Sequence, residues 1–267
     1  MPRIKAGSIN LNYETSGEGE PLLLIMGFGM SGAAWLPMIP FMQDFKCIYF
    51  DNRGTGDSDR PDGPYTVADM AEDASNLLAA LDIPRAKIYG VSMGGMISQE
   101  LAIRHPEKVI KAVFGCTTPG GPHASAAEPE VIAKLTEGFK LIPTDPDKGF
   151  DMIMPTLYPK EFVAAHPELK QLMITGAKLA APTPPETVDR LIVGLEQFDA
   201  YDRLPRIKCP VLIVHGDSDV LVPAENAAII KSRLAQAELF MIENAGHGYQ
   251  AADPVAVHKR IVDWLKN

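Results

Sequence analysis

Two side chains in this sequence are of the types that nucleophilic catalysis requires. Ser92 lies in the pentapeptide Gly-Val-Ser-Met-Gly, and His247 lies between two glycines near the end of the chain. A serine hydroxyl is a weak nucleophile at neutral pH, so it needs a base within hydrogen-bonding reach and an acid that orients the base. We predict that Ser92 is a nucleophile and that His247 is its base.

The acid that would orient His247 has two candidates in one loop. Asp217 directly follows Gly216, where an aspartate commonly shapes a turn. Asp219 lies deeper in the same loop, before Pro223. We therefore favour Asp219 as the acid, with a solvated turn as the alternative for both carboxylates. The three residues would then follow one another along the chain in the order Ser, Asp, His.

The other histidines are less suited to act as the base. His105 and His166 precede prolines, His123 lies in a proline-rich loop, and His258 falls in an expected C-terminal helix. His215 ends an expected strand, where we predict a structural role.

The residues around Ser92 predict a sharp turn between a strand and a helix. Residues 85–89 have a strand pattern and residues 96–104 a helical one. Gly90 and Gly94 flank the apex of the turn, where a Cβ would collide with the strand or the helix. The helix N-terminus supplies partial positive charge and free N–H groups that favour an oxyanion. A packing turn with an idle serine is the alternative.

The rest of the chain alternates between expected strands and helices. The apolar runs 22–26, 46–50, 109–116 and 210–216 are typical of strands buried on both faces, and 67–81 has an amphipathic helical pattern. This alternation predicts an α/β fold with a mostly parallel sheet, whose loops open on one edge. We also expect an edge hairpin at 3–15, a helix within 35–45 despite two prolines, helices at 224–234 and 254–266, and a strand at 238–243.

Residues 121–204 lack any strand pattern. We expect helices at 128–142, 145–154, 159–178 and 184–200, which together form an inserted helical unit; residues 1–120 and 205–267 then form the core. The insertion is rich in methionine and aromatic side chains, which suit an adaptable apolar pocket. The predicted substrate-binding residues are Gly27, Met152, Met154 and Phe198, with simple packing as the alternative for the three side chains of the insertion.

Composition limits the partners of this protein. The formal net charge of −9 offers no basic field for a nucleic acid or an anionic membrane. The N-terminal residues contain no apolar run of the signal-peptide type, and no stretch approaches the roughly 20 apolar residues of a spanning helix. We therefore expect a cytoplasmic protein without a membrane span.

The cysteines and acidic residues indicate no cofactor. Cys47, Cys116 and Cys209 lie in or beside expected strands, and we expect them to be buried reduced thiols. No histidine is paired with any of them by spacing, so a nucleophilic cysteine is a weaker hypothesis. The acidic pairs lie in turns rather than at metal-ligand spacing, so we expect no metal and no organic cofactor.

Taken together, these motifs resemble the α/β-hydrolase superfamily. Gly90-x-Ser92-x-Gly94-Gly95, His215-Gly216-x-x-Asp219 and Gly246-His247-Gly248 occur in the order typical of that family, as do Gly27-Phe28-Gly29 and Asp51-x-Arg53-Gly54-x-Gly56-x-Ser58. The resemblance implies an eight-stranded sheet with an antiparallel second strand, and a helical cap after the sixth strand. Residues 121–204 fit that cap.

The resemblance also implies an oxyanion hole made by the backbone N–H groups of Phe28 and Met93. The family often has His-Gly where this chain has Met26-Gly27, which keeps the amide of Phe28 but removes a polar side chain. Within the superfamily the chain is similar to small cofactor-free enzymes: 3-oxoadipate enol-lactonases, carboxylesterases and non-haem haloperoxidase-like proteins. Haloalkane dehalogenases and epoxide hydrolases differ, since they carry aspartate at the position of Ser92.

We therefore expect a serine hydrolase that cleaves a small-molecule ester or lactone through an acyl-enzyme. A perhydrolase, or a C–C bond hydrolase of ring-cleavage products, could use the same triad. The C–C hydrolase would need cations for a dienoate, for which Arg190 and Arg203 are the only candidates in the insertion; surface solvation is the favoured role of both. A ligand receptor on the same scaffold is a further alternative. The sequence indicates no oligomeric state.

Overall fold

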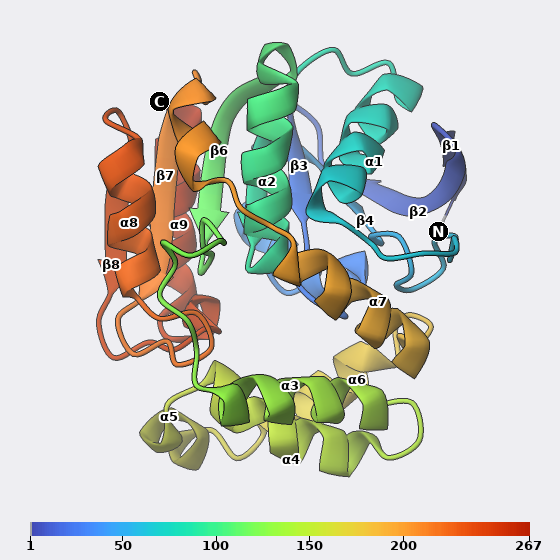
Figure 1. Ribbon diagram of the computed structural model, residues 1–267, viewed down its shortest axis with the longest axis vertical. Coiled ribbons are helices and arrows are strands. Elements are labelled where there is room, and N and C mark those ends of the chain that lie inside the picture. Colours follow the sequence, from blue (N-terminus) through green and yellow to red (C-terminus); the bar gives the residue numbers. More distant parts are fainter. Residues whose placement is uncertain (1) are drawn as a thin grey trace.

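The computed structural model describes residues 2–267 and contains one eight-stranded sheet (Figure 1). The strands lie in the order β1-β2-β4-β3-β5-β6-β7-β8. β2 is antiparallel to both of its neighbours, and every other neighbouring pair is parallel. The predicted mostly parallel sheet, with its antiparallel second strand, is therefore confirmed. Its strands are β1 Arg3–Ala6, β2 Ile9–Ser16, β3 Glu20–Ile25, β4 Phe45–Phe50, β5 Ala86–Val91, β6 Val109–Gly115, β7 Val211–Gly216 and β8 Glu238–Ile242.

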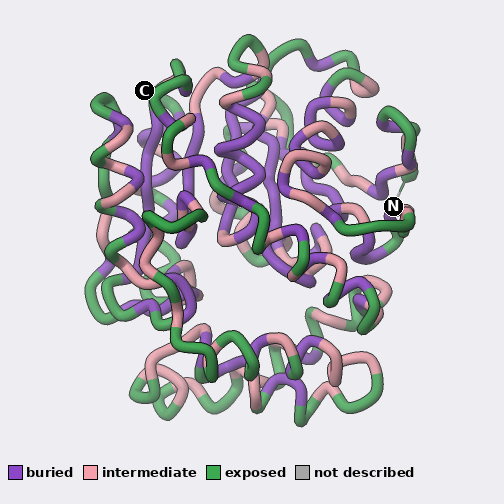
Figure 2. The backbone as a smooth tube through the Cα atoms, in the orientation of Figure 1, coloured by how far each residue is buried: buried purple, intermediate pink, exposed green. Residues whose placement is uncertain are grey.

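The central strands are apolar along their whole length because both faces of the sheet are covered. Leu23 and Ile25 of β3 pack into one hydrophobic cluster with α1 (Val67–Ala80), α2 (Met93–Arg104) and α8 (Glu225–Arg233). Leu22 and Leu24 point the other way, into a cluster with α9 (Pro254–Lys266) and the short 3-10 helices after β3. Figure 2 shows the resulting buried centre of the molecule.

The register of the parallel strands brings their carboxyl ends to one edge. Ile25 is paired with Gly90, Val91 with Gly115, and Gly216 with Ile242. The loops after β3, β5, β6, β7 and β8 therefore all open on the same edge, as the sequence predicts. The motifs that contain Gly27, Ser92, Asp219 and His247 all lie in these loops.

The expected helix within 35–45 is wrong. The structure has two short 3-10 helices there, η1 (Gly32–Trp35) and η2 (Ile39–Phe41). Pro37 and Pro40 each lack the N–H that an α-helix would require, and Pro40 occupies the tolerated first turn of η2.

The segment between β6 and β7 contains five α-helices, which lie below the carboxyl edge of the sheet in Figure 1. The expected helix at 159–178 is instead two helices, because Pro167 disfavours helical backbone at His166, whose φ is −127° and ψ 65°. The expected helix at 184–200 ends early, at Glu196. The five helices are α3 Pro129–Leu141, α4 Pro146–Leu157, α5 Lys160–Ala165, α6 Leu169–Ala177 and α7 Pro185–Glu196.

The two connections of this insertion are tied together at its base. The amide of Gly121 donates to the carbonyl of Phe198 at 3.0 Å, and the amide of Ala200 donates to the carbonyl of Pro119 at 2.8 Å. Gly120 adopts a φ of +69°, and a Cβ there would lie 2.1 Å from the carbonyl oxygen of Phe198. A glycine is therefore required at this crossing.

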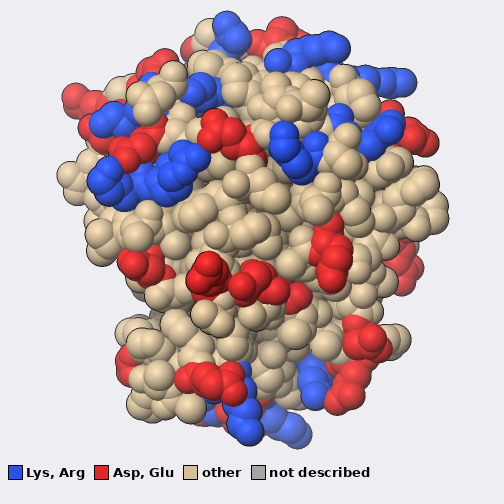
Figure 3. Space-filling model, turned by 90° about the vertical axis from the view of Figure 1, so that its left-hand side faces the viewer, with Lys and Arg blue, Asp and Glu red and all other residues tan. Residues whose placement is uncertain are grey.

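Surface features agree with the acidic composition. Figure 3 shows one face on which acidic side chains form a row across the middle of the molecule, with most basic side chains above that row and others at the bottom of the view. Among residues 2–267, no helix combines the length and the apolar character needed to cross a bilayer.

Cys47 and Cys116 are buried free thiols as expected, whereas Cys209 is only partly buried.

Candidate active site

Ser92 occupies a strained position at the end of β5. Its φ is +57° and ψ −122°, and its amide donates to the carbonyl of Gly115 at 2.8 Å. The flanking glycines are required by close backbone approach. A Cβ on Gly90 would lie 2.1 Å from the carbonyl oxygen of Gly94, and one on Gly94 would lie 2.0 Å from that of Ile25. The turn thus holds Ser92 at the start of α2 in a backbone conformation that costs free energy.

The carbonyl of Ser92 is anchored on three sides. It accepts hydrogen bonds from the amides of Gly95 and Met96, at 2.8 and 3.2 Å, and from Thr117 Oγ1 at 2.9 Å. Thr117 follows β6, so the neighbouring strand helps to hold the turn. Hydrogen bonds from α2 and from the loop after β6 therefore hold the strained backbone of Ser92 in place.

His247 and Asp219 are directly joined. His247 Nδ1 lies 2.8 Å from Asp219 Oδ2, and both side chains are buried. The other carboxylate oxygen of Asp219 accepts hydrogen bonds from the amides of Leu221 and Val222, each at 2.9 Å. Asp217, by contrast, lies in the exposed part of the loop and hydrogen bonds to Ser218. The structure therefore brings Asp219, and not Asp217, to His247.

Charge interactions shift both groups of this pair. Burial by itself would raise the pKa of Asp219, but the positive charge of His247 and the hydrogen bonds from His215 and His247 lower it to about 2. Burial by itself would lower the pKa of His247, but the interactions with the Asp219 carboxylate and with Cys116 together raise it well above the ordinary 6.5. The contact therefore favours the ionised form of each partner.

His215 contacts both Asp219 and the backbone of the same loop. Its Nε2 lies 2.9 Å from the carbonyl oxygen of Val222 and 3.3 Å from Asp219 Oδ2. The side chain is fully buried at the end of β7. His215 thus braces the loop that carries Asp219.

The loop after β3 lies against Ser92. A Cβ on Gly27 would be 3.1 Å from the Cβ of Ser92, so the two backbones nearly touch. Within residues 2–267, neither the amide of Phe28 nor that of Met93 donates to another protein group. Met93 begins α2, where the first amides have no helical partner. Both N–H groups are thus available to a ligand.

The structure separates the predicted substrate-binding side chains. Phe198 lies at the base of the insertion, where its ring packs over Gly120, so its contacts are those of a packing residue. Met154 of α4 is buried but belongs to neither of the two hydrophobic clusters of the sheet, and Met152 is partly buried. A pocket role for the two methionines remains a prediction.

Residues of the insertion that the sequence did not single out contact the loop after β3. The ring of Phe139 in α3 meets that of Phe28 edge to face, with centroids 5.4 Å apart. Thr183 Oγ1 donates to the carbonyl of Gly29 at 2.7 Å, and Gly29 has a φ of +66°. In the sequence, only the glycine motif at 27–29 marks this loop as a place of close contact. Its partners Phe139 and Thr183 come from a distant segment, so no local pattern identifies them.

A cysteine also lies beside the histidine, which the spacing of the sequence did not indicate. Cys116, directly after β6, is one of the groups whose interaction raises the pKa of His247. The backbone of Cys116 has a φ of +39°, in the left-handed region. The strand order explains this proximity, since β6 lies between β5, which carries Ser92, and β7, which precedes Asp219.

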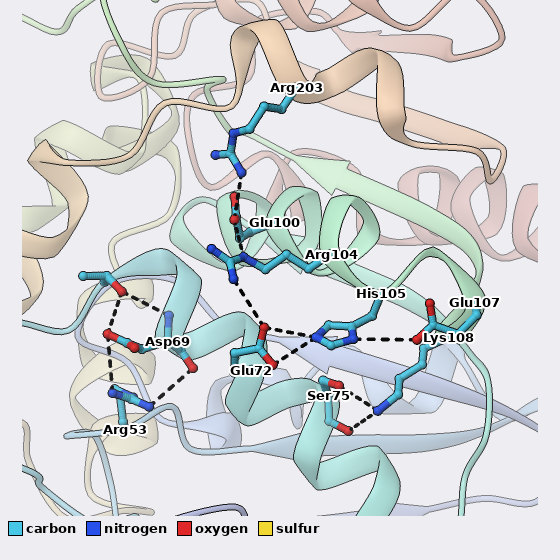
Figure 4. A network of polar contacts seen from close by, with 11 residues as sticks. Arg53, Asp69, Glu72, Ser75, Glu100, Arg104, His105, Glu107, Lys108 and Arg203 are labelled. Atoms are coloured by element: carbon cyan, nitrogen blue, oxygen red, sulfur yellow. Dashed lines mark hydrogen bonds and ion pairs between the residues drawn. The ribbon is translucent and has the colours of Figure 1, made fainter.

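The arginines of the insertion are committed to structural contacts. Arg203 Nη1 pairs with the buried carboxylate of Glu100 at 2.8 Å, within the network shown in Figure 4. Glu100 is also paired with Arg104 of the same helix. Arg190 donates to the carbonyl of Pro61 at 2.7 Å and to the hydroxyl of Tyr65 at 3.1 Å. Neither arginine is simply solvated, and neither presents a free guanidinium.

The side chains of the site do not form a metal-binding cluster. Across residues 2–267, no group of three or more histidine, cysteine, aspartate or glutamate side chains is arranged to hold a metal ion. His215, Asp219 and His247 are bound to one another or to the backbone.

Residues 20–254 match the family described as "alpha/beta hydrolase fold". The chain belongs to this family. The resemblance inferred from the sequence motifs is thereby confirmed, and this hydrolase groups with cofactor-free members of the superfamily.

Three relatives illustrate the similarity. The hydrolase is 31% identical to "Putative carbamate hydrolase RutD" of Caulobacter vibrioides, over 100% of its own chain and 99% of the relative. It resembles the enol-lactonase of Burkholderia xenovorans LB400 with a TM-score of 0.85 and 22% identity, covering 100% of both chains. It resembles a thermophilic esterase of Thermogutta terrifontis with a TM-score of 0.83 and 25% identity, covering 99% and 97% of the two chains.

Proposed function

We propose that this hydrolase cleaves a carboxylic ester or lactone with Ser92 as nucleophile, His247 as base and Asp219 as the orienting acid. The observation that carries the proposal is the 2.8 Å contact between His247 Nδ1 and Asp219 Oδ2. This contact leaves Nε2 as the nitrogen of His247 that would serve Ser92, whose strained turn lies at the same edge of the sheet.

In the first half of the reaction, Ser92 Oγ attacks the carbonyl carbon and His247 takes the hydroxyl proton. The amides of Phe28 and Met93 stabilise the oxyanion that forms. Collapse of this intermediate breaks the bond to the leaving alcohol, which receives the proton from His247. The acyl group is left on Ser92.

In the second half, His247 takes a proton from water, and the hydroxide attacks the acyl carbon. The oxyanion is again stabilised by the two amides, and the proton returns to Ser92 Oγ as the acid departs. Asp219 stays ionised throughout, since its role is to orient the imidazole and stabilise its charged form.

We further propose that residues 121–204 act as a cap over a core of residues 1–120 and 205–267. The cap would supply a mainly apolar pocket, with Met152 and Met154 as candidate walls and Gly27 beside the reacting carbonyl. Because Arg190 and Arg203 are engaged elsewhere, we infer an uncharged substrate rather than a dienoate. This argues against the C–C bond hydrolase alternative.

A carbamate is a second candidate substrate, favoured by the full-length similarity to the RutD relative. A carbamate carbonyl would pass through the same tetrahedral intermediate at Ser92. The esterase relative favours the ester instead. The two candidates share the triad and differ in the substituents of the carbonyl carbon, which in a carbamate include a nitrogen, so loss of an alcohol would leave a carbamoyl group on Ser92 in place of an acyl group.

The deciding experiment is hydrolysis of aryl esters of increasing acyl length, simple lactones and a carbamate by the wild type and by Ser92→Ala. We expect turnover that falls about 10⁴-fold or more in Ser92→Ala. Equal activity of the two proteins would refute the serine mechanism. Negligible turnover by the wild type on every substrate would favour a C–C hydrolase or a receptor, and acceleration by hydrogen peroxide would indicate a perhydrolase.

A further inference from the structure

The loop that carries His247 is held by the insertion as well as by the core. The amide of Gly248 donates to the carbonyl of Leu157 at 2.9 Å. Leu157 is the last residue of α4, so this hydrogen bond joins the insertion to the residue next to His247. In Figure 1 the α5 end of the insertion lies beneath α8 and α9, on the side where this loop leaves β8.

The two glycines beside His247 are required by this contact. A Cβ on Gly248 would lie 2.3 Å from the ring of Tyr158, and its three nearest heavy atoms all belong to Tyr158. A Cβ on Gly246 would lie 2.6 Å from the carbonyl oxygen of Leu157 and 3.1 Å from Pro159. Neither glycine has a positive φ, so close approach rather than backbone conformation explains both.

The remaining space between these segments is small. A void of only about 10 Å³ lies between the Tyr158–Phe162 side of the insertion and the 244–248 loop. Tyr158 is itself stacked on Phe162, with ring centroids 5.5 Å apart. The ring against Gly248 is therefore packed on both sides.

The core holds the same loop from the opposite direction. Tyr249, the second residue after His247, is fully buried, and its hydroxyl lies 2.8 Å from that of Tyr89 in β5. Asp219 contacts the imidazole itself. His247 thus lies in a loop clamped between β5 and the end of α4.

We propose that Tyr158 and the carbonyl of Leu157 are positioning groups that hold His247 against Asp219. The base would then be aligned from the insertion and not by the core alone. This inference rests on the proposed function, in which His247 is the base. Tyr158 acts through the loop and touches no reacting atom.

The pKa of His247 depends on the charged and titratable groups around its ring. Asp219 faces it from the loop after β7 and Cys116 from the end of β6, while Tyr158, directly after α4, packs against the neighbouring Gly248. His215 acts on it through Asp219. Burial lowers the pKa of His247 and Asp219 supplies the largest interaction that raises it, so a weaker contact with Asp219 lowers that pKa as long as the ring stays buried.

The test is the substitution Gly248→Ala, alone and combined with Tyr158→Ala. We expect Gly248→Ala to lower kcat/KM about 10²-fold through misalignment of the base, and to move the acid limb of the pH profile to lower pH. Removal of the ring should relieve the collision, so the double variant should recover the activity of Tyr158→Ala alone.

Two further glycines provide matched controls. Tyr158→Ala should not rescue Gly246→Ala, whose obstacles are Leu157 and Pro159. Gly176 lies in α6 of the same insertion, and a Cβ there would have no atom within 4 Å apart from the neighbouring backbone of its own helix, so Gly176→Ala should behave as the wild type. Melting temperatures show which variants fold. If Gly248→Ala alone does not fold, recovery of folding in the double variant with Tyr158→Ala tests the same contact.

A titration of the His247 imidazole by NMR separates this inference from the proposed function. It needs no turnover, so a hydrolase inactive on every substrate still shows whether Gly248→Ala lowers the pKa of His247. An unchanged pKa in Gly248→Ala, or equal rescue of Gly246→Ala by Tyr158→Ala, would overturn the positioning role. If Ser92→Ala stays fully active but the pKa of His247 is lowered in Gly248→Ala, only the proposed reaction is overturned and the positioning role stands.

Discussion

His215 Nε2 lies 3.3 Å from the same oxygen of Asp219 that receives His247. The same nitrogen lies 2.9 Å from the carbonyl oxygen of Val222, so His215 joins the two ends of the loop after β7. A single buried carboxylate is thus held by two histidines and two backbone amides. The position of the His247 ring depends on this loop as much as on Asp219 itself.

Replacement of His215 by leucine should weaken that support without removing the acid. The buried carbonyl of Val222 would lose its donor, which costs about 1–3 kcal/mol of the free energy of unfolding. The pKa of Asp219 should rise, because a hydrogen bond that lowers it is lost. Urea unfolding and kcat/KM would check this, and an activity loss as large as that of Asp219→Asn would contradict a supporting role.

Asp219→Asn should abolish most activity while the protein stays folded. The amide cannot stabilise the imidazolium and can turn its NH₂ toward His247, so we expect kcat to fall on the order of 10⁴-fold. Asp217→Asn is the matched control, because Asp217 is exposed in the same loop. Steady-state kinetics with an activated ester would compare the two. An equal loss of activity in Asp219→Asn and Asp217→Asn would contradict the assignment of Asp219 as the orienting acid.

Activity and stability should respond to pH in opposite directions near the pKa of His247. His247 must be neutral to act as a base, so kcat/KM should rise as pH passes through its raised pKa, above 6.5. A raised pKa in the folded state stabilises the protein at lower pH, and this contribution is lost as pH rises through that pKa. Asp219 contributes stability above its unfolded pKa, and this is lost as pH falls toward about 2.

Parallel pH series of ester hydrolysis and urea unfolding would test this relation. In Asp219→Asn the histidine loses its partner, so the acid limb should move to lower pH and the linked loss of stability should disappear. An acid limb that stays in place in Asp219→Asn would show that another group controls the profile.

Arg203→Met should reduce stability but not the hydrolysis of neutral esters. Glu100 would keep Arg104 as a partner, so we expect a loss of about 1–2 kcal/mol in the free energy of unfolding. Arg206→Met is the control, since Arg206 is exposed in the same 3-10 helix, η4 (Tyr201–Arg206). A specific rise of KM for carboxylated substrates in Arg203→Met would instead support the C–C hydrolase alternative.

Local patterns were sufficient to predict a mostly parallel sheet, whereas its eight strands and antiparallel second strand were implied by the family resemblance. Leu22 to Ile25 alternate between two hydrophobic clusters, and such doubly buried strands are continuous apolar runs in the sequence. The split of the helix expected at 159–178 also had a local signal in Pro167, which outweighed the helical periodicity on either side.

The sequence by itself determined the fold, the strained turn at Ser92 and the loops that carry Asp219 and His247. Local backbone constraints and the common edge of a parallel sheet are enough to predict these features. Only the tertiary structure decided which contacts join the insertion to that edge. Tyr158 meets Gly248, and Arg203 meets Glu100, through the packing of segments distant in the chain, which no periodicity or motif encodes.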